Sequence, residues 1–146
     1  MGGEGAAVGG GFGLALMADF RVVCPATRMT ANFVKLGFTP GFGLTHTLAR
    51  IVGVQRANLL FMTGRRINGE TAHEWGLGDV YTDNDNVREA SIELAQEIAV
   101  NAPLALLSLR DQMRPGLADA VNDVTTIESR EQKWLQQTND HKEGVK

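Results

Sequence analysis

The sequence predicts an α/β fold with short strands in its first half and helices in its second. Two segments rich in β-branched and apolar residues, 20–24 and 28–30, are separated by a turn at 25–27, which favours a pair of strands. In the second half, apolar residues recur at roughly helical spacing. The helices expected there are 87–100, 103–113 and 117–138.

Glycine and proline divide the middle of the chain into short elements. The segment 32–43 contains Gly37, Pro40, Gly41 and Gly43, so we expect a loop. Glycines at 53 and 64 are placed to end helices, and an asparagine at 68 is placed to cap one. The elements expected are helices at 45–52, 54–62 and 68–76, a strand at 79–81 and a turn at 84–86.

The stretch 5–19, which reads GAAVGGGFGLALMAD, is the main candidate for a functional site. Its three consecutive glycines precede the helix-forming run 14–18. A glycine loop at a helix start presents backbone N–H groups that an anionic oxygen can approach closely. Such a site suits a phosphate or the oxyanion of a thioester, and the alternative is a tight turn into a buried helix.

The glycine spacing disfavours the known phosphate-binding loops. A dinucleotide-binding G-x-G-x-x-G pattern would need its last glycine where Leu14 or Leu16 stands. A P-loop needs a Gly-Lys pair, and the sequence has none. The thioester interpretation is therefore the one that remains for an anion.

Composition limits the class of protein. The 146 residues favour one domain, and the net charge of −3 argues against a nucleic-acid surface. The single cysteine, Cys24, excludes an internal disulfide and fits a reducing compartment. No apolar run approaches the ~20 residues that span a bilayer, and the N-terminus has no basic signal-peptide region. We expect a cytoplasmic protein without a membrane segment, a metal site or a nucleic-acid partner.

Several motifs together resemble the crotonase family of enoyl-CoA hydratases and isomerases. The glycine stretch matches as G-x-A-x-GGG-x-x-LAL-x-x-D-x-R, and the resemblance continues in register through almost the whole chain. The further matching segments are KLGFTPGFG at 35–43, LARIVG at 48–53, TGRRI at 63–67, WGL at 75–77 and DHKEG at 140–144.

The resemblance implies the end of a crotonase ββα spiral followed by a helical oligomerisation region. We expect one crotonase-like domain over 1–146, with the end of the spiral core at 1–83 and the helical region at 84–146. Family members look about a hundred residues longer at the N-terminal end, so the chain resembles the C-terminal part of a crotonase.

The resemblance also implies an acyl-CoA site. The middle glycine of the triplet, Gly10, would donate its N–H to the thioester oxygen. Coenzyme A would be part of the substrate, and no separate cofactor is expected. The residues expected to line the substrate are Gly9, Gly11, Phe33, Gly41 and Phe42.

The acids customary in this family are missing from their aligned positions. The two glutamates of the hydratases fall on Gly13 and Phe33, and the acid of the isomerases falls on Gly41. Two interpretations stay open: an enzyme of the hydratase/isomerase class, or a catalytically inactive acyl-CoA-binding or oligomerisation module of the same fold.

The last long helix predicts assembly. It carries a narrow apolar stripe, which suits packing against one surface. The residues of the stripe are Val121, Val124, Ile127, Trp134 and Leu135. The residues of the opposite, polar face are Asp119, Asp123, Glu128, Arg130, Glu131 and Lys133. The family's corresponding helices meet around a threefold axis, so we expect a homotrimer or a hexamer.

The remaining polar candidates are weaker. We expect a structural role for Asp19 and a surface or capping role for His46. Five basic residues could meet coenzyme phosphates or remain solvated: Lys35, Arg50, Arg56, Arg65 and Arg66.

Overall fold

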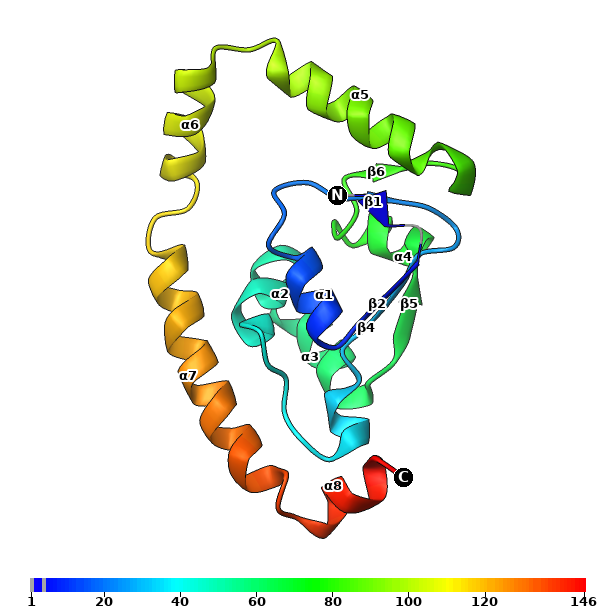
Figure 1. The fold of residues 1–146 in the computed structure, drawn as a ribbon, viewed down its shortest axis with the longest axis vertical. Helices are drawn as coiled ribbons and strands as arrows, with labels where there is room; N and C mark the ends of the chain where they lie inside the picture. The colour runs from blue at the N-terminus through cyan, green and yellow to red at the C-terminus, as the bar shows by residue number, and fades with distance from the viewer. Residues whose placement is uncertain (1, 4) are drawn as a thin grey trace.

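The computed structural model describes residues 2, 3 and 5–146 and has two small sheets, a cluster of short helices and an outer arch of longer helices (Figure 1). The strands are β1 (Gly2–Gly3), β2 (Ala6–Val8), β3 (Val22–Val23), β4 (Arg28–Thr30), β5 (Arg66–Asn68) and β6 (Val80–Tyr81). The helices are α1 (Gly10–Ala15), η1 (Asn32–Leu36, 3-10), α2 (Leu44–Val52), α3 (Val54–Thr63), α4 (Gly69–Glu74), η2 (Asn84–Asn86, 3-10), α5 (Val87–Ala99), α6 (Pro103–Gln112), α7 (Leu117–Leu135) and α8 (Asn139–Gly144).

Each sheet joins strands that are distant in sequence. In the first, β1 and β6 both pair with β3 in parallel. In the second, β4 pairs with β2 in parallel and with β5 in antiparallel orientation. The α/β class is confirmed. The strands β1, β2 and β5 were not predicted, because their sequences GG, AAV and RIN contain no run of β-branched residues and only pairing with a distant strand makes them part of a sheet.

Local stop signals were predicted well. Gly53 and Gly64 end α2 and α3 with positive φ values of 82° and 55°, as glycine permits. The side chain of Asn68 caps α4 by accepting a hydrogen bond from the Thr71 N–H at 2.9 Å. Pro103 stands in the first turn of α6, where its missing N–H costs no helical hydrogen bond.

Four predicted elements differ in extent from those in the structure. The last long helix ends at Leu135 and not at residue 138, because Thr138 caps the separate helix α8 by accepting from the His141 N–H. The expected loop 32–43 begins with the 3-10 helix η1. The strands predicted at 20–24 and 79–81 are shorter in the structure. Within these segments only β3 and β6 form backbone pairs, and they pair with each other.

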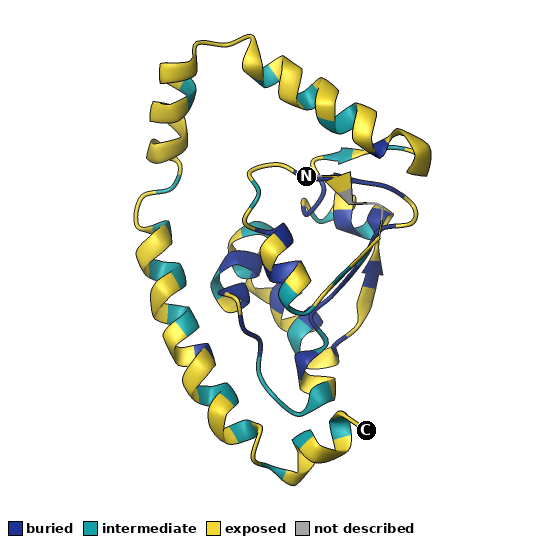
Figure 2. Cartoon of the chain, viewed as in Figure 1, coloured by how far each residue is buried: buried dark blue, intermediate teal, exposed yellow. Residues whose placement is uncertain are grey.

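The core lies between the second sheet and the helices α1 to α4. Its largest fully buried side chains include Phe12, Leu44, Leu48, Leu60 and Leu77. By contrast, α5, α6 and α7 curve round this body and are mostly exposed (Figure 2). The chain returns at α8, where the imidazole Nδ1 of His141 lies 2.6 Å from the carbonyl oxygen of Leu36 on η1.

Candidate functional site

The glycine triplet forms the first turn of a helix rather than a loop before one. Gly9 has a φ of 53°, and its carbonyl accepts from the N–H groups of Phe12 at 3.1 Å and Gly13 at 3.2 Å. The prediction that the helix occupies 14–18 is therefore wrong: α1 begins at Gly10 and ends at Ala15. The reason is that the Gly9 carbonyl, placed by a backbone that favours glycine, already closes the first turn.

Two donors at this turn point away from the helix ladder. Among the described residues, the N–H groups of Gly10 and Gly11 have no hydrogen-bond acceptor. The Gly9 N–H differs, because it donates to the Thr30 carbonyl at 3.0 Å and so ties the turn to β4. The structure thus places two free backbone donors at a helix N-terminus, which is the arrangement that can receive a partially negative oxygen.

Aromatic side chains pack around the same turn. A Cβ built on Gly10 would lie 2.5 Å from the ring carbon Cε2 of Phe42, and one built on Gly13 would lie 2.6 Å from the Phe42 Cβ. On the other side, the Phe33 ring stands 3.7 Å from the Cβ position of Gly9. Of the residues predicted to line the substrate, Gly9, Phe33 and Phe42 therefore meet around Gly10.

Phe42 has an unusual backbone. Its φ of 61° makes it the one non-glycine with positive φ in the described part of the chain, and Gly43 follows at 68°. Its side chain is 62% exposed, so it covers the glycine turn from the solvent side.

The carboxylate that holds this segment is Glu128 on α7. Its Oε2 accepts from the Gly43 N–H at 2.8 Å, and its Oε1 accepts from the Thr45 N–H at 3.0 Å and the Thr45 hydroxyl at 2.7 Å. Glu128 is only 4% exposed. Its prediction on the outer polar face of the helix is wrong, because the free N–H groups at the start of α2 attract a carboxylate inward.

Gly41 packs against the same helix. A Cβ at Gly41 would lie 2.7 Å from the Gln132 Nε2, which donates to the Thr39 carbonyl at 2.9 Å. The Thr39 hydroxyl is buried and has no hydrogen-bond partner among the described residues. Gly41 is thus buried under α7. Gly9 and Gly10 are half-buried, and Phe42 is exposed.

Comparison with known proteins decides the family. The family model for enoyl-CoA hydratase/isomerase matches residues 4–146. The chain belongs to this family, the crotonases. Curated relatives include a short-chain-enoyl-CoA hydratase of Clostridioides difficile, 34% identical over 93% of this chain and 88% of that protein. An enoyl-CoA isomerase/hydratase of Mycosarcoma maydis is 40% identical over 70% of this chain and 38% of that protein.

Solved structures confirm the crotonase fold. A carnitinyl-CoA hydratase of Mycobacterium avium superposes with a TM-score of 0.89 at 29% identity, over 97% of this chain and 56% of that one. An enoyl-CoA hydratase/isomerase of Pseudoalteromonas atlantica superposes with a TM-score of 0.90 at 24% identity, over 97% of this chain and 57% of that one. This crotonase chain therefore spans little more than half the length of these structures.

Each of the three customary acid positions packs closely against other residues of this crotonase. A glutamate at Gly13 would drive its Cβ into the Cβ of Phe42. Phe33 is 6% exposed and makes an edge-to-face contact with Phe38, with ring centroids 5.7 Å apart, so it belongs to the core as well as to the glycine site. Gly41 meets the Gln132 amide. At all three positions, the space that a glutamate or aspartate side chain would need is therefore taken by a neighbouring side chain or by the phenylalanine itself.

Asp19 links the core of this crotonase to its outer helices. Its carboxylate pairs with Arg110 on α6 at 2.9 Å and with Arg114 just beyond that helix. Arg21 lies behind it, with Nε donating to the Leu77 carbonyl at 2.5 Å. Burial lowers the pKa of the Arg21 guanidinium, and the negative charges of Asp79 and Asp19 oppose that shift.

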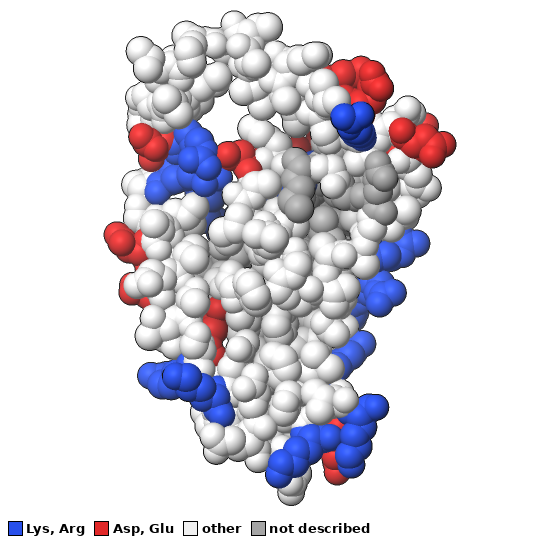
Figure 3. All heavy atoms as spheres, viewed as in Figure 1, with Lys and Arg blue, Asp and Glu red and all other residues white. Residues whose placement is uncertain are grey.

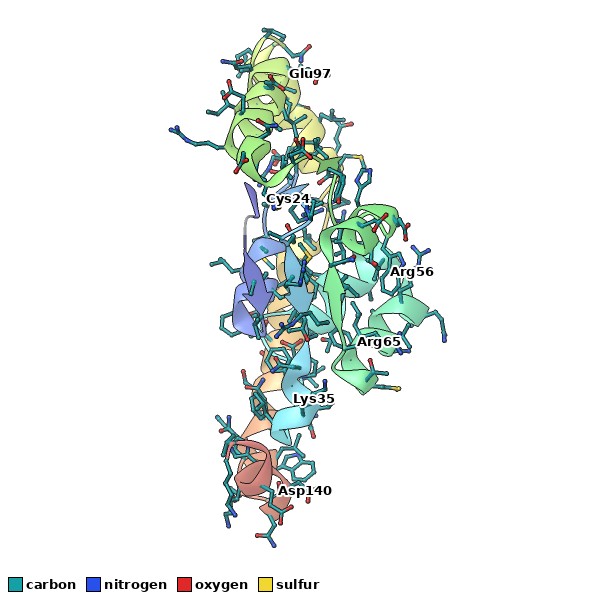
Figure 4. All side chains as sticks on the ribbon, turned by 90° about the vertical axis from the view of Figure 1, so that its right-hand side faces the viewer. Cys24, Lys35, Arg56, Arg65, Glu97 and Asp140 are labelled. Carbon is teal, nitrogen blue, oxygen red and sulfur yellow. The ribbon has the colours of Figure 1, made fainter. Side chains whose placement is uncertain are left out.

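The other polar candidates lie apart from the glycine turn. His46 is half-buried in the first turn of α2. The basic residues predicted as possible phosphate contacts make no ion pair with any described residue. Arg56 lies over the Trp75 ring at 5.1 Å, and Figure 4 shows Arg56, Arg65 and Lys35 spread along one side of the molecule. No group of three His, Cys, Asp or Glu that could hold a metal occurs among the residues described.

A large apolar cavity separates the arch from the core. It has a volume of about 930 Å³ and lies between the end of α1, α2 and the inner faces of α6 and α7. Figure 3 shows the opening at the arch of α5 and α6.

Among the described residues, 2, 3 and 5–146, no single helix is long and apolar enough to cross a membrane. The two helical segments Asn84–Ala99 and Pro103–Gln112 meet the length and composition criteria only when taken together, and they are bent at the break between them.

Proposed function

We propose that this chain handles the thioester of an acyl-CoA, with the Gly10 N–H as one donor of an oxyanion hole. The observation that supports the proposal is the free N–H at the first turn of α1, in a family of enoyl-CoA hydratases and isomerases. A preorganised donor of this kind contributes about 3 kcal/mol to transition-state stabilisation. Coenzyme A enters as part of the substrate, and the proposal needs no separate cofactor.

The lining of the site supports the same proposal. Gly9 and Gly11 leave the turn without side chains that would obstruct a thioester. The exposed ring of Phe42, with the largely buried ring of Phe33 beside Gly9, offers an apolar wall to an acyl group. Gly41 would act indirectly, by allowing its loop to pack closely on Gln132. Free backbone donors with apolar walls suit binding and polarisation of a carbonyl group.

A second candidate is a catalytically inactive acyl-CoA-binding or oligomerisation module. Gly13, Phe33 and Gly41 at the customary acid positions favour it, because hydration across a double bond needs a base for the water and an acid for the carbon. Exposed apolar side chains on α6, among them Leu104 and Leu107, favour assembly with further copies in either case. We propose a homotrimer or hexamer in the cytoplasm.

The test compares two ligands and two variants. Butyryl-CoA has the thioester oxygen, and the thioether S-butyl-CoA lacks it. Gly10→Ala and Gly10→Pro add the same Cβ against Phe42, but only the proline removes the N–H, at a helix position that tolerates proline. We expect the wild type and Gly10→Ala to bind the thioester about five-fold more tightly than the thioether, as one hydrogen bond allows.

Isothermal titration calorimetry on the full chain measures both affinities. Gly10→Pro should bind the two ligands equally. Equal affinities already in the wild type would contradict the role of Gly10, and a retained preference in Gly10→Pro would assign the oxygen to another donor. Binding of neither ligand by the wild type would favour a pure assembly module.

A further inference from the structure

The helix α7 holds the loop 39–43 at both of its ends. Glu128 accepts from the N–H of Gly43, and Gln132, four residues later and so on the same helix face, donates to the Thr39 carbonyl. Figure 1 shows this loop between η1 and α2, on the side that faces α7. Phe42 lies between these two attachment points, and its side chain packs against the glycine turn.

The position of the Phe42 side chain is set by the conformation of its backbone and not by packing in the core. Its side chain is 62% exposed, so the core does not hold the ring. Its φ of 61° is one that L-residues avoid, and such a conformation persists only where the surroundings impose it. The adjoining Gly43 N–H, fixed at 2.8 Å by a buried carboxylate, is the nearest such restraint.

The contact of Phe42 with α1 is close enough for a small movement to matter. The Cβ of Phe42 lies 2.6 Å from the Cβ position of Gly13, and its ring lies 2.5 Å from that of Gly10. A tilt of the Phe42 backbone would therefore change the space beside the Gly10 N–H directly.

We propose that Glu128 is a positioning residue: through Gly43 it fixes Phe42 over Gly10 and Gly13, and so sets the space available to an acyl group beside the Gly10 N–H. The part that concerns the acyl group rests on the proposed function. The part that concerns the position of the ring does not, and it can be measured without any ligand.

The first experiment measures the ring position by NMR. In protein labelled with ¹⁵N-glycine, the Phe42 ring current shifts the amide signals of Gly10 and Gly13, and Phe42→Ala identifies that contribution. Glu128→Gln keeps the shape of the side chain but replaces one acceptor oxygen by a donor, so it breaks at least one of the three hydrogen bonds. We expect Glu128→Gln to move the Gly10 and Gly13 signals toward their Phe42→Ala positions.

Controls separate this effect from general loosening. Glu97→Gln makes the same chemical change on the exposed surface of α5 and should leave both signals in place. If Glu128→Gln does not fold, Thr45→Val removes only the hydroxyl contact to Glu128 and should move the signals in the same direction by less. Movement of Gly43 alone, with Gly10 and Gly13 unchanged, would show that Glu128 is only a helix cap and would overturn the proposal.

The second experiment measures acyl-chain selectivity as the ratio of the affinities for hexanoyl-CoA and acetyl-CoA. One methylene in an apolar pocket changes binding by about ten-fold, so Phe42→Ala should change this ratio by at least that factor. Glu128→Gln should change it in the same direction, and the double variant should match Phe42→Ala. A purely structural role would weaken both ligands equally and leave the ratio unchanged, which would overturn the selectivity claim. Absence of binding in the wild type would count against the proposed function and leave the NMR result standing.

Discussion

The Oε2 atom of Glu128 lies 2.8 Å from the backbone nitrogen of Gly43, across 85 residues of sequence. This contact joins the outer helix α7 to the N-terminus of α2 and to the loop that covers the glycine turn. It is therefore one of two hydrogen-bonded contacts that join α7 to the loop of the candidate site, the other being the bond from Gln132 to the Thr39 carbonyl.

Glu128→Ala should lower the free energy of unfolding by about 3 kcal/mol. It removes a helix cap and leaves the buried Gly43 N–H without an acceptor. For a chain of this size the loss corresponds to a fall in Tm of roughly 10 °C, measurable by circular dichroism. Glu97→Ala on the exposed face of α5 is the matched control and should change stability by less than about 0.5 kcal/mol. Equal effects of the two variants would contradict the capping role.

The glycines of α1 should respond differently to alanine. A Cβ at Gly11 meets no atom within 4 Å, so Gly11→Ala should be neutral or stabilise by up to about 1 kcal/mol, since alanine favours helix. A Cβ at Gly10 meets the Phe42 ring, so Gly10→Ala should destabilise by about 1 kcal/mol. Chemical denaturation measures both, and Phe42→Ala should remove the Gly10→Ala penalty because it removes the ring.

Gly13→Ala should behave differently again. The atom that its Cβ meets is the Cβ of Phe42, which Phe42→Ala retains. We expect a loss of about 1–3 kcal/mol that Phe42→Ala does not relieve and Phe42→Gly does. Glycine at 42 also suits the φ of 61°. Full relief by Phe42→Ala would mean that the ring and not the backbone position causes the conflict.

Thr39→Val should raise the free energy of unfolding by about 1 kcal/mol. The Thr39 hydroxyl is buried without a hydrogen-bond partner among the described residues, and valine has nearly the same shape without the polar atom. Thermal unfolding in parallel with Thr126→Val on the exposed face of α7 tests this, since the Thr126 hydroxyl donates to the Asn122 carbonyl. A loss of stability in Thr39→Val would show that the hydroxyl has a partner in solution.

The chain by itself should not hydrate crotonyl-CoA above background. A general acid or base contributes about 10²–10⁴-fold each, and the customary positions hold Gly13, Phe33 and Gly41. The measurement is loss of enoyl absorbance at high protein concentration. Turnover within about a hundredfold of an ordinary hydratase would contradict this prediction and require an acid from elsewhere in the chain.

The outer face of α7 should mediate assembly. Ile127 is 51% exposed and Trp134 54% exposed, whereas Val121 packs against the Gly43 backbone. We expect sedimentation at micromolar concentration to give three or six times the formula mass of 15.8 kDa. Ile127→Lys with Trp134→Lys should yield a folded monomer, and Val121→Lys should unfold the chain. A wild-type sedimentation mass of 15.8 kDa, which is that of one chain, would contradict the proposal.

Much of the fold could be predicted from the sequence because its signals are local. Gly53, Gly64 and Asn68 end or cap helices through their own backbone freedom or side chain, and the structure confirms all three. The periodicity of 87–100 likewise matched α5 closely. The motif around Gly10, together with the matching segments that follow it, indicated the crotonase family, and the family match over residues 4–146 confirms it.

What the sequence by itself determined is therefore the α/β class, the family and the glycine turn as the candidate site. Tertiary structure alone decided that Glu128 turns inward, that Phe42 covers Gly10 and Gly13, and that strands of two or three residues pair. The physical reason is the range of the interactions. Caps and helix periods depend on atoms a few residues apart, whereas a buried carboxylate and a strand pair depend on partners that only folding brings within hydrogen-bond distance.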